Sequence, residues 1–473
     1  MENLIEILKA DPENAIKKLT ASTKDPIKIQ KLREEYNETN RHVRKSQIGW
    51  IQKDKHPAGR ETVKAVRIPI AFQKKIVNTA AAFEVGEQIT LKPSNDTELS
   101  KEIGRLWNNN RIDFKLQELV KLQKSELQCA LLFSIEDLKP NNFVNRILGV
   151  NTSKEIKTKI LKNSSGTMTP YFNEYGNMTA FVWEYLTRDV KANKDVRNVL
   201  ILDKERAYTL NNALGKMALT EDAKAHGFDK IPIVYFSQEK EEWFDVKEMI
   251  DRLEVTVSKL GAANDYSGQP ILKLFGKVNG APDKDADGKA MHFNMVEGED
   301  GKIERGDAEF LERSDASQSV ELEIKLLNNY ISSMTSTPDW SFESLKGLGD
   351  ISGKALKMMF IDPLTKAKMN EGYNRTAIER ILSVFISGTI TTTQISYKSQ
   401  ARDLFYDIQF NSIIPDDVES TVESVIKAVN GNVMSIDTAL SILDFVTDKE
   451  AEKALIMERL KPIETIIEPI DAQ

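Results

Sequence analysis

The segment GLGDISGKA, residues 347–355, combines glycines with a lysine as phosphate-binding loops do. Backbone amides after Gly353 and the ammonium group of Lys354 would meet a phosphate at the start of a helix. The spacing differs from that of a nucleotide-binding loop, because Leu348 stands where the first glycine belongs and Ala355 stands where Ser or Thr would bind magnesium. The pattern therefore argues against nucleotide hydrolysis at this segment.

Three alternating carboxylates, Asp283, Asp285 and Asp287, match the opening of a calcium-binding loop. The twelfth position is Asn294 rather than a bidentate Glu, and strands rather than helices are expected on both sides. A solvated acidic hairpin tip is the favoured interpretation, and a weak calcium or magnesium site is the alternative. We therefore predict no dedicated metal site.

Other catalytic patterns are missing from the sequence. The four histidines are scattered without metal-ligand spacing, and the chain has no GxSxG motif of the kind that presents a nucleophilic serine. We therefore expect a protein without enzymatic activity and without a cofactor.

Composition places the chain among soluble globular proteins of two to four compact units. It has 473 residues, of which 40% are hydrophobic and 29% charged. The single cysteine, Cys129, lies in the apolar run CALLFSI, which predicts a buried thiol in a reducing cytosol. The acidic N-terminus argues against export, and no apolar run reaches membrane-spanning length. A net charge of −7 argues against a broad basic face that binds DNA by sequence, but not against a conduit for DNA.

The first half of the chain predicts a mixed α+β unit. Apolar residues recur with helical spacing over residues 67–83, and later segments such as 132–136 and 178–185 predict strands separated by turns. After residue 415 three helices are expected, the second of which Ser435 would cap.

Between these parts lie two amphipathic helices, over about residues 239–260 and 317–334. Each helix has one narrow apolar stripe. We expect the two stripes to pack through Leu253, Val257, Ile324 and Leu327. The helices could form an antiparallel pair within a monomer. Because one narrow stripe buries little within a single chain, we favour contact with neighbouring subunits. Acidic residues are expected on the other faces, namely Asp245, Glu248, Asp251, Glu254, Glu321 and Glu323.

A long helix is expected over residues 352–388. Ser352 would cap its first amides, at a cost of about 1 kcal/mol if lost. Pro363 removes one backbone hydrogen bond and is expected to kink the helix near Met359. The loop before this helix contains Trp340 and several glycines.

This order of parts resembles the portal proteins of tailed bacteriophages, the ring-shaped head-to-tail connectors. The likeness is strongest over residues 307–357, DAEFLERSDASQSVELEIKLLNNYISSMTSTPDWSFESLKGLGDISGKALK, and weaker over residues 67–91, RIPIAFQKKIVNTAAAFEVGEQITL. The resemblance implies an α+β portal-like fold with named parts. These are a wing (1–238), a first stem helix (239–267), a β-rich clip (268–313), a second stem helix (314–335), a tunnel loop (336–351), a kinked tunnel helix of the wing (352–388), a wing return strand (389–415) and a helical crown with a tail (416–473).

The resemblance also implies a function. It implies rings of twelve subunits at one capsid vertex of the virion, through which double-stranded DNA passes without sequence specificity. The implied partners are other copies of the chain, the terminase large subunit, scaffold, the major capsid protein and a head-completion adaptor, with assembly in the host cytoplasm and no membrane. An acidic stem would repel the DNA backbone over about a nanometre.

Within the implied tunnel loop, some side chains would pack against neighbouring loops or touch DNA. These candidates are Trp340, Phe342, Lys346, Gly347 and Gly349, and the loop-to-helix junction would be formed by Ser352, Gly353 and Lys354. An alternative is that Trp340 and Phe342 are ordinary core anchors of a helix connection. For the whole protein two alternatives stay open: a nucleotide-driven DNA-packaging or remodelling enzyme, and a non-viral helical oligomeric scaffold.

Overall fold

The computed structural model describes residues 11–20, 26–39, 41–44, 53–54, 58–59, 61–62, 64–137, 154–190, 193–220, 224–267, 317–338, 358–414, 418–443 and 449–459, with short strands between 272 and 310. The chain divides into two compact units. The first comprises Met1–Asp339 and Pro363–Asn411, and the second comprises Trp340–Asp362 and Ser412–Gln473. The mixed helix and strand composition agrees with the sequence-based prediction.

The first unit is built around a three-stranded antiparallel sheet in the order β10-β2-β3. Its strands are β10 (Ile233–Ser237), β2 (Gln128–Asp137) and β3 (Lys154–Lys162). Successive side chains of β2 point to opposite faces, as a pleated strand requires. Cys129, Leu131 and Phe133 enter a core shared with helices, whereas Ala130 and Leu132 face a second sheet. Cys129 is fully buried, as predicted, and burial raises the pKa of its thiol.

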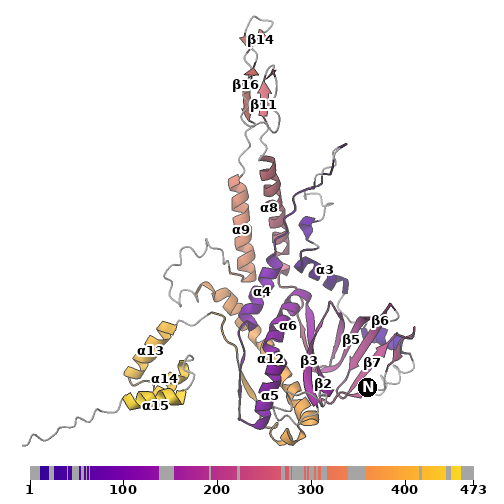
Figure 1. The fold of residues 1–473 in the computed structure, drawn as a ribbon, viewed down its shortest axis with the longest axis vertical. Coiled ribbons are helices and arrows are strands. Elements are labelled where there is room, and N and C mark those ends of the chain that lie inside the picture. The colour runs from indigo at the N-terminus through magenta and orange to yellow at the C-terminus, as the bar shows by residue number, and fades with distance from the viewer. Residues whose placement is uncertain are drawn as a thin grey trace, which may run out of the picture. The chain divides into compact units, whose positions relative to one another are not determined.

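Helices cover one face of this sheet (Figure 1). They are α5 (Glu98–Asn109), α6 (Ile112–Glu126) and the long α12 (Ile361–Gly388). Their buried side chains form the largest core, together with β2. The helix α4 (Phe72–Val85) packs beside α6, and Trp107 donates a hydrogen bond of 3.0 Å from Nε1 to Asp113 at the α5–α6 junction. The helices therefore hold α12 against the sheet.

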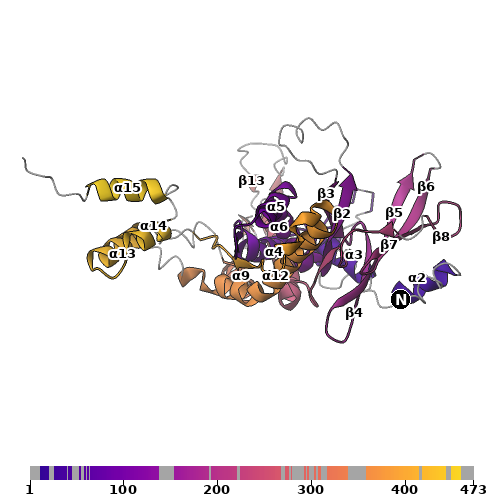
Figure 2. The same cartoon turned by 90° about the horizontal axis from the view of Figure 1, so that it is seen from below.

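A six-stranded antiparallel sheet packs on the other face (Figure 2). Its strands are β4 (Gly166–Phe172), β5 (Met178–Asp189), β6 (Lys194–Leu202), β7 (Arg206–Asn211), β8 (Ala218–Leu219) and β9 (Lys224–Ala225). The short helix α2 (Pro12–Thr20) covers this sheet through Ala15 and Ile16. The layers are thus helices, sheet, sheet and helix.

A separate two-stranded sheet joins distant parts of the sequence. β1 (Thr90–Pro93) pairs with β17 (Tyr406–Gln409) in antiparallel register, with Thr90 opposite Gln409. Before β17 the chain passes through a π-helical turn, η3 (Thr389–Thr393), and a 3-10 helix, η4 (Ile395–Ser399). The expected return strand therefore completes the first unit.

Two further helices, α8 (Lys247–Ser267) and α9 (Ser317–Thr335), pack against each other. α8 begins later than the expected residue 239, because residues 238–243 form a turn bonded to α6, in which the amide of Glu242 donates to Lys124 O at 3.1 Å. The 3-10 helix η2 (Phe244–Val246) precedes α8, and α3 (Pro26–Tyr36) and η1 (His42–Arg44) pack beside it.

The sequence between α8 and α9 contains short antiparallel strand pairs, as predicted. β11 (Leu272–Phe275) pairs with β16 (Asp307–Phe310), β12 (Val278–Asn279) with β13 (His292–Phe293), and β14 (Val296–Glu297) with β15 (Ile303–Glu304). The expected acidic turn, with Asp283, Asp285 and Asp287, lies outside the described residues.

The described part of the second unit includes the helices α13 (Val418–Asn430), α14 (Ile436–Ile442) and α15 (Lys449–Arg459). Ser435 is the N-cap of α14, and its hydroxyl accepts a hydrogen bond of 3.2 Å from the amide of Thr438, which confirms the predicted cap. Among the helices that the structure describes, none has the length and apolarity needed to span a membrane.

Candidate functional site

The four predicted stem residues gather in one apolar cluster around α8 and α9. Leu253 is 1% exposed, and Val257, Ile324 and Leu327 are partly buried against the same cluster. Side chains of α3 and α4, namely Leu32, Ile76 and Val77, complete this cluster within one chain. The expectation that neighbouring subunits must cover these stripes was therefore wrong for Leu253, because segments far away in the sequence already cover it.

The expected acidic faces of these helices also need correction. Glu254 is fully buried, and its Oε1 lies 3.2 Å from Nη1 of Arg41, which is 1% exposed. The backbone amide of Ile70 donates to the same carboxylate oxygen at 2.8 Å. Glu323 is half-buried and pairs with Arg252 at 2.7 Å. Asp245, Glu248 and Glu321 are exposed, as predicted.

Burial shifts the pKa values of both members of this ion pair. Desolvation raises the pKa of Glu254 to about 7, although the Ile70 amide and Arg41 oppose the shift. Desolvation likewise lowers the pKa of Arg41. One turn further on, the hydroxyl of Ser258 accepts a hydrogen bond of 2.9 Å from the amide of Ile68. These polar side chains fix α8 to the extended segment before α4.

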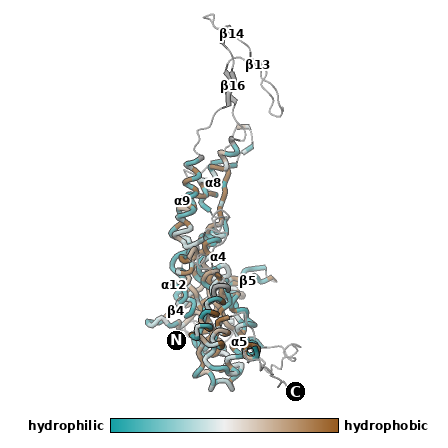
Figure 3. The backbone as a smooth tube through the Cα atoms, turned by 90° about the vertical axis from the view of Figure 1, so that its left-hand side faces the viewer, coloured by the Kyte–Doolittle hydropathy of each residue, from teal (hydrophilic) through white to brown (hydrophobic). Residues whose placement is uncertain are grey.

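α9 exposes a second apolar row that the sequence reasoning missed. Figure 3 shows hydrophobic and hydrophilic residues alternating along α8 and α9. The exposed side chains recur every four residues, with exposures between 42% and 58%; they are Leu322, Leu326, Tyr330 and Met334. The i, i+4 spacing was visible in the sequence, but the buried stripe of the same helix obscured it.

α12 also exposes large apolar side chains, at Met369 (81%) and Tyr373 (61%). Contiguous exposed apolar rows are typical of surfaces that another protein covers. Within the described residues, the two rows lie on different helices of the same unit.

Pro363 stands in the first turn of α12, which begins at Ile361 after a turn at Phe360. The first amides of a helix have no partner within that helix, so proline is tolerated there. Met358 and Met359, directly before the turn, are also helical. The predicted kink near Met359 stays a prediction, because most of the expected helix before Met358 lies outside the described residues. The same holds for the predicted loop and junction residues, which are Trp340, Phe342, Lys346, Gly347, Gly349, Ser352, Gly353 and Lys354.

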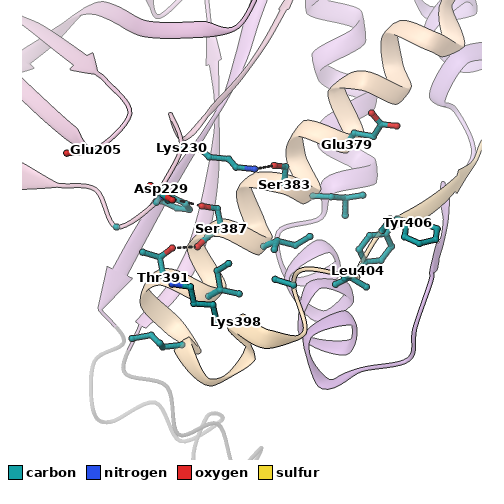
Figure 4. A pocket seen from close by; sticks show the side chains of 18 of the residues that line it. Glu205, Asp229, Lys230, Glu379, Ser383, Ser387, Thr391, Lys398, Leu404 and Tyr406 are labelled. Atoms are coloured by element: carbon teal, nitrogen blue, oxygen red, sulfur yellow. Dashed lines mark hydrogen bonds between the residues drawn. The ribbon is translucent and has the colours of Figure 1, made fainter. Parts of the chain in front are cut away.

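A groove of about 840 Å³ lies between the C-terminal half of α12 and the segment before β10 (Figure 4). Its apolar lining includes Leu382 and Leu404. The amide of Asp229 donates to Ser387 Oγ at 3.1 Å, and Lys230 donates to Ser383 Oγ. These bonds join α12 to the sheet, so we interpret the groove as part of the packing that orients α12. In the described part of the chain, no cluster of three or more His, Cys, Asp or Glu side chains could hold a metal ion.

The sequence of the chain is similar to those of known proteins. The family model described as "Phage portal protein, SPP1 Gp6-like" matches residues 17–463. The portal protein of Bacillus phage SPP1 is 24% identical over 247 residues, which are 51% of this chain and 47% of that protein. The chain thus matches about half the length of this curated relative.

Two solved structures are also similar in part. One, described as the virion of a native gene transfer agent particle, covers 82% of this chain and 88% of that chain, with 11% identity and a TM-score of 0.33. The other, described as the neck of the native particle computed with C12 symmetry, covers 79% and 88%, with 11% identity and a TM-score of 0.37.

Proposed function

Because this chain belongs to the SPP1 Gp6-like family of phage portal proteins, we propose that its copies form a closed ring at one capsid vertex, through which double-stranded DNA is packaged, retained and ejected. The observation that carries this proposal is the family match over residues 17–463, nearly the whole chain. The virion is its place of action, after assembly in the host cytoplasm. In this proposal the protein has no catalytic role.

The exposed apolar rows support assembly into a ring. A cyclic ring of identical subunits joins two different patches head to tail. The row on α9 and the exposed residues Met369 and Tyr373 of α12 provide two such patches on one chain. Burying them between neighbours would remove apolar surface from water, which favours association. We propose a ring of twelve subunits.

The parts of the chain then have distinct roles. We assign α8 and α9 to the stem, the strand pairs between them to the clip, the first unit apart from these to the wing, and α13, α14 and α15 to the crown. The clip would dock the terminase large subunit during packaging and a head-completion adaptor afterwards. Scaffold and the major capsid protein would contact the ring from outside.

Residues 336–351 would form the tunnel loop that meets DNA in the channel. Lys346 would approach phosphates, while Trp340 and Phe342 would pack between loops of neighbouring subunits. Gly347 and Gly349 would give the loop its conformational freedom. Gly353 and Lys354 would follow Ser352 at the junction with the helix. The exposed acids Asp245, Glu248 and Glu321 would keep DNA from adhering to the stem.

Electron microscopy of the purified protein tests the proposal. Negative-stain top views are expected to show rings with a central hole, and native mass measurement is expected to give twelve copies of a 53.5 kDa chain. Solitary molecules, dimers or open filaments at every salt and protein concentration would contradict it. ATP turnover that Lys354→Ala abolishes would instead favour a nucleotide-driven enzyme.

A further inference from the structure

The C-terminal end of α9 has an unusual cap. Ser336 adopts a left-handed backbone conformation with φ of 54°. Glycine is the residue usually found in this conformation just after the end of a helix. The amide of Ser336 donates to Ser333 O at 3.2 Å, and the amide of Thr337 donates to Ser332 O at 2.9 Å. These two bonds form a Schellman motif, which ends the helix and turns the chain. The left-handed serine is strained, so the turn depends on other contacts.

Lys366 of α12 supplies such a contact. Its ammonium group donates to the backbone carbonyl of Thr335 at 2.9 Å, at the last residue of α9. A cation at this place also complements the negative end of the helix dipole. The Thr335 hydroxyl, buried in the same turn, donates to Ile331 O at 2.7 Å and lies 2.9 Å from the Thr337 hydroxyl.

A buried ion-pair network holds Lys366 in place. Its Nζ lies 2.6 Å from Glu242 Oε1, and the other oxygen of Glu242 lies 3.3 Å from Lys124 Nζ. Lys124 in turn lies 2.8 Å from Glu84. Burial disfavours the charged form of Glu242, but Lys124 and Lys366 outweigh it and lower the pKa of this carboxyl.

The network also ties α12 to α4 at a second level. Asn370 Nδ2 donates to Glu84 Oε1 at 2.6 Å, and Asn374 Nδ2 donates to Glu84 Oε2 at 3.1 Å. Two lysines and two glutamates balance in charge, and the two amides fill acceptor sites of Glu84. A buried polar network that is paired in this way fixes the relative position of its helices.

We propose that Lys366 is a positioning residue that couples α12 to the end of α9 and thereby sets the direction in which the chain leaves the stem. This inference rests on the proposed function, in which the chain beyond Thr337 continues into the channel. A shift of α12 would be transmitted through Lys366 to the Thr335 carbonyl, and so to the turn at Ser336. DNA packaging or retention would then depend on this one ammonium group.

Hydrogen exchange of the full-length protein, followed by mass spectrometry, tests the local part of the proposal. In Lys366→Met, the amides of Ser336 and Thr337 are expected to lose protection, while β2 and β5 keep theirs. Lys366→Arg, which keeps a charged donor, is expected to restore protection. The control is Lys368→Met, two residues along α12, because Lys368 is exposed and, among the residues that the structure describes, its ion pair is with Glu371 of the same helix at 2.5 Å. Unchanged exchange at Ser336 and Thr337 in Lys366→Met would overturn the proposal.

A phage complementation assay tests the functional part. Lys366→Met is expected to form rings and to lower the thermal stability moderately, because it removes one cation from the buried charge network. It is also expected to yield fewer DNA-filled capsids, with recovery in Lys366→Arg and no loss in Lys368→Met. If Lys366→Met fails to fold, Glu242→Gln is the second variant, since it keeps the side-chain shape and removes the negative charge that pairs with Lys366. Wild-type yields of filled capsids from folded rings of both variants would overturn the role in packaging. If the wild-type protein forms no rings, the proposed function fails, whereas the exchange experiment still decides the coupling.

Discussion

Replacing Leu326 with Asp tests whether the exposed row of α9 joins neighbouring subunits. Leu326 is 42% exposed and lies in the middle of the row of Leu322, Tyr330 and Met334. Because more than half of the side chain is already buried in the single chain, we expect Leu326→Asp to lower the free energy of unfolding of the subunit by roughly 1–2 kcal/mol, which a domain of ordinary stability tolerates. The decisive effect is therefore expected on assembly, with the subunit still folded.

The size of that effect follows from the exposed fraction. Full burial of a leucine contributes about 1.5–3 kcal/mol, so covering the remaining exposed part contributes roughly 1 kcal/mol at each interface. Placing a carboxylate there adds an unfavourable desolvation of about 1–3 kcal/mol. The sum, about 2–4 kcal/mol, weakens each contact roughly 30- to 700-fold, since 1.4 kcal/mol corresponds to about a factor of ten.

The assay is sedimentation velocity combined with negative-stain imaging, at matched protein concentration and salt. Asn328→Asp is the control, because it adds the same charge at a half-buried position of α9 outside the exposed row. We expect rings from wild type and Asn328→Asp, and folded subunits without rings from Leu326→Asp. Intact rings from Leu326→Asp would refute the assignment of this row to an interface, and an unfolded subunit would refute the claim that the row is free in the single chain.

Other predictions concern α8, α12 and the acidic turn. The pKa of Glu254 is raised from 4.5 to about 7 in the folded state, so the stability that its protonated form contributes is lost as the pH rises through that range. Unfolding in urea at pH 5 and at pH 7.5 should therefore give free energies whose difference is about 2 kcal/mol smaller in Glu254→Gln than in wild type. An equal difference in both proteins would contradict the shift. Gly388→Ala should lower stability by about 1–3 kcal/mol, since the added Cβ would lie 2.4 Å from the ring of Phe228. Gly372→Ala should raise stability by about 0.5–1 kcal/mol, because its Cβ would meet nothing within 4 Å. Thermal unfolding measures both effects, and the opposite order would refute the packing. Calorimetric titration with about millimolar calcium should give no heat, because Asn294 replaces the bidentate glutamate, and saturable binding would refute that interpretation.

Local signals in the sequence predicted much of the helical structure. α9 begins at Ser317 as expected and ends at Thr335, one residue beyond the prediction, because its apolar periodicity is regular over the whole length. Ser435 was identified as a cap from its residue type and its place before an apolar run. The burial of Cys129 followed from its apolar neighbours. Each of these signals lies within a few residues of the feature that it predicts.

The contacts that the sequence did not predict join residues far apart. Arg41 and Glu254 are 213 positions apart, and no periodicity within either segment indicates that these two side chains pair inside the protein. The start of α8 was placed too early because the turn at residues 238–243 depends on carbonyls of α6. Likewise, Lys366 is one of two lysines in α12, and only the folded structure distinguishes it from Lys368.

The pairing of β1 with β17 has a consequence for synthesis of the protein. Thr90 lies opposite Gln409, so β1 leaves the ribosome more than three hundred residues before its partner strand exists. At translation rates of about 5–20 residues per second, this delay is roughly 15–60 s. During that interval the first unit has an unpaired strand edge and a core that lacks Leu404 and Ile408. A nascent chain therefore cannot present a finished surface to other copies, and recruitment into an assembly has to wait until β17 has been synthesised.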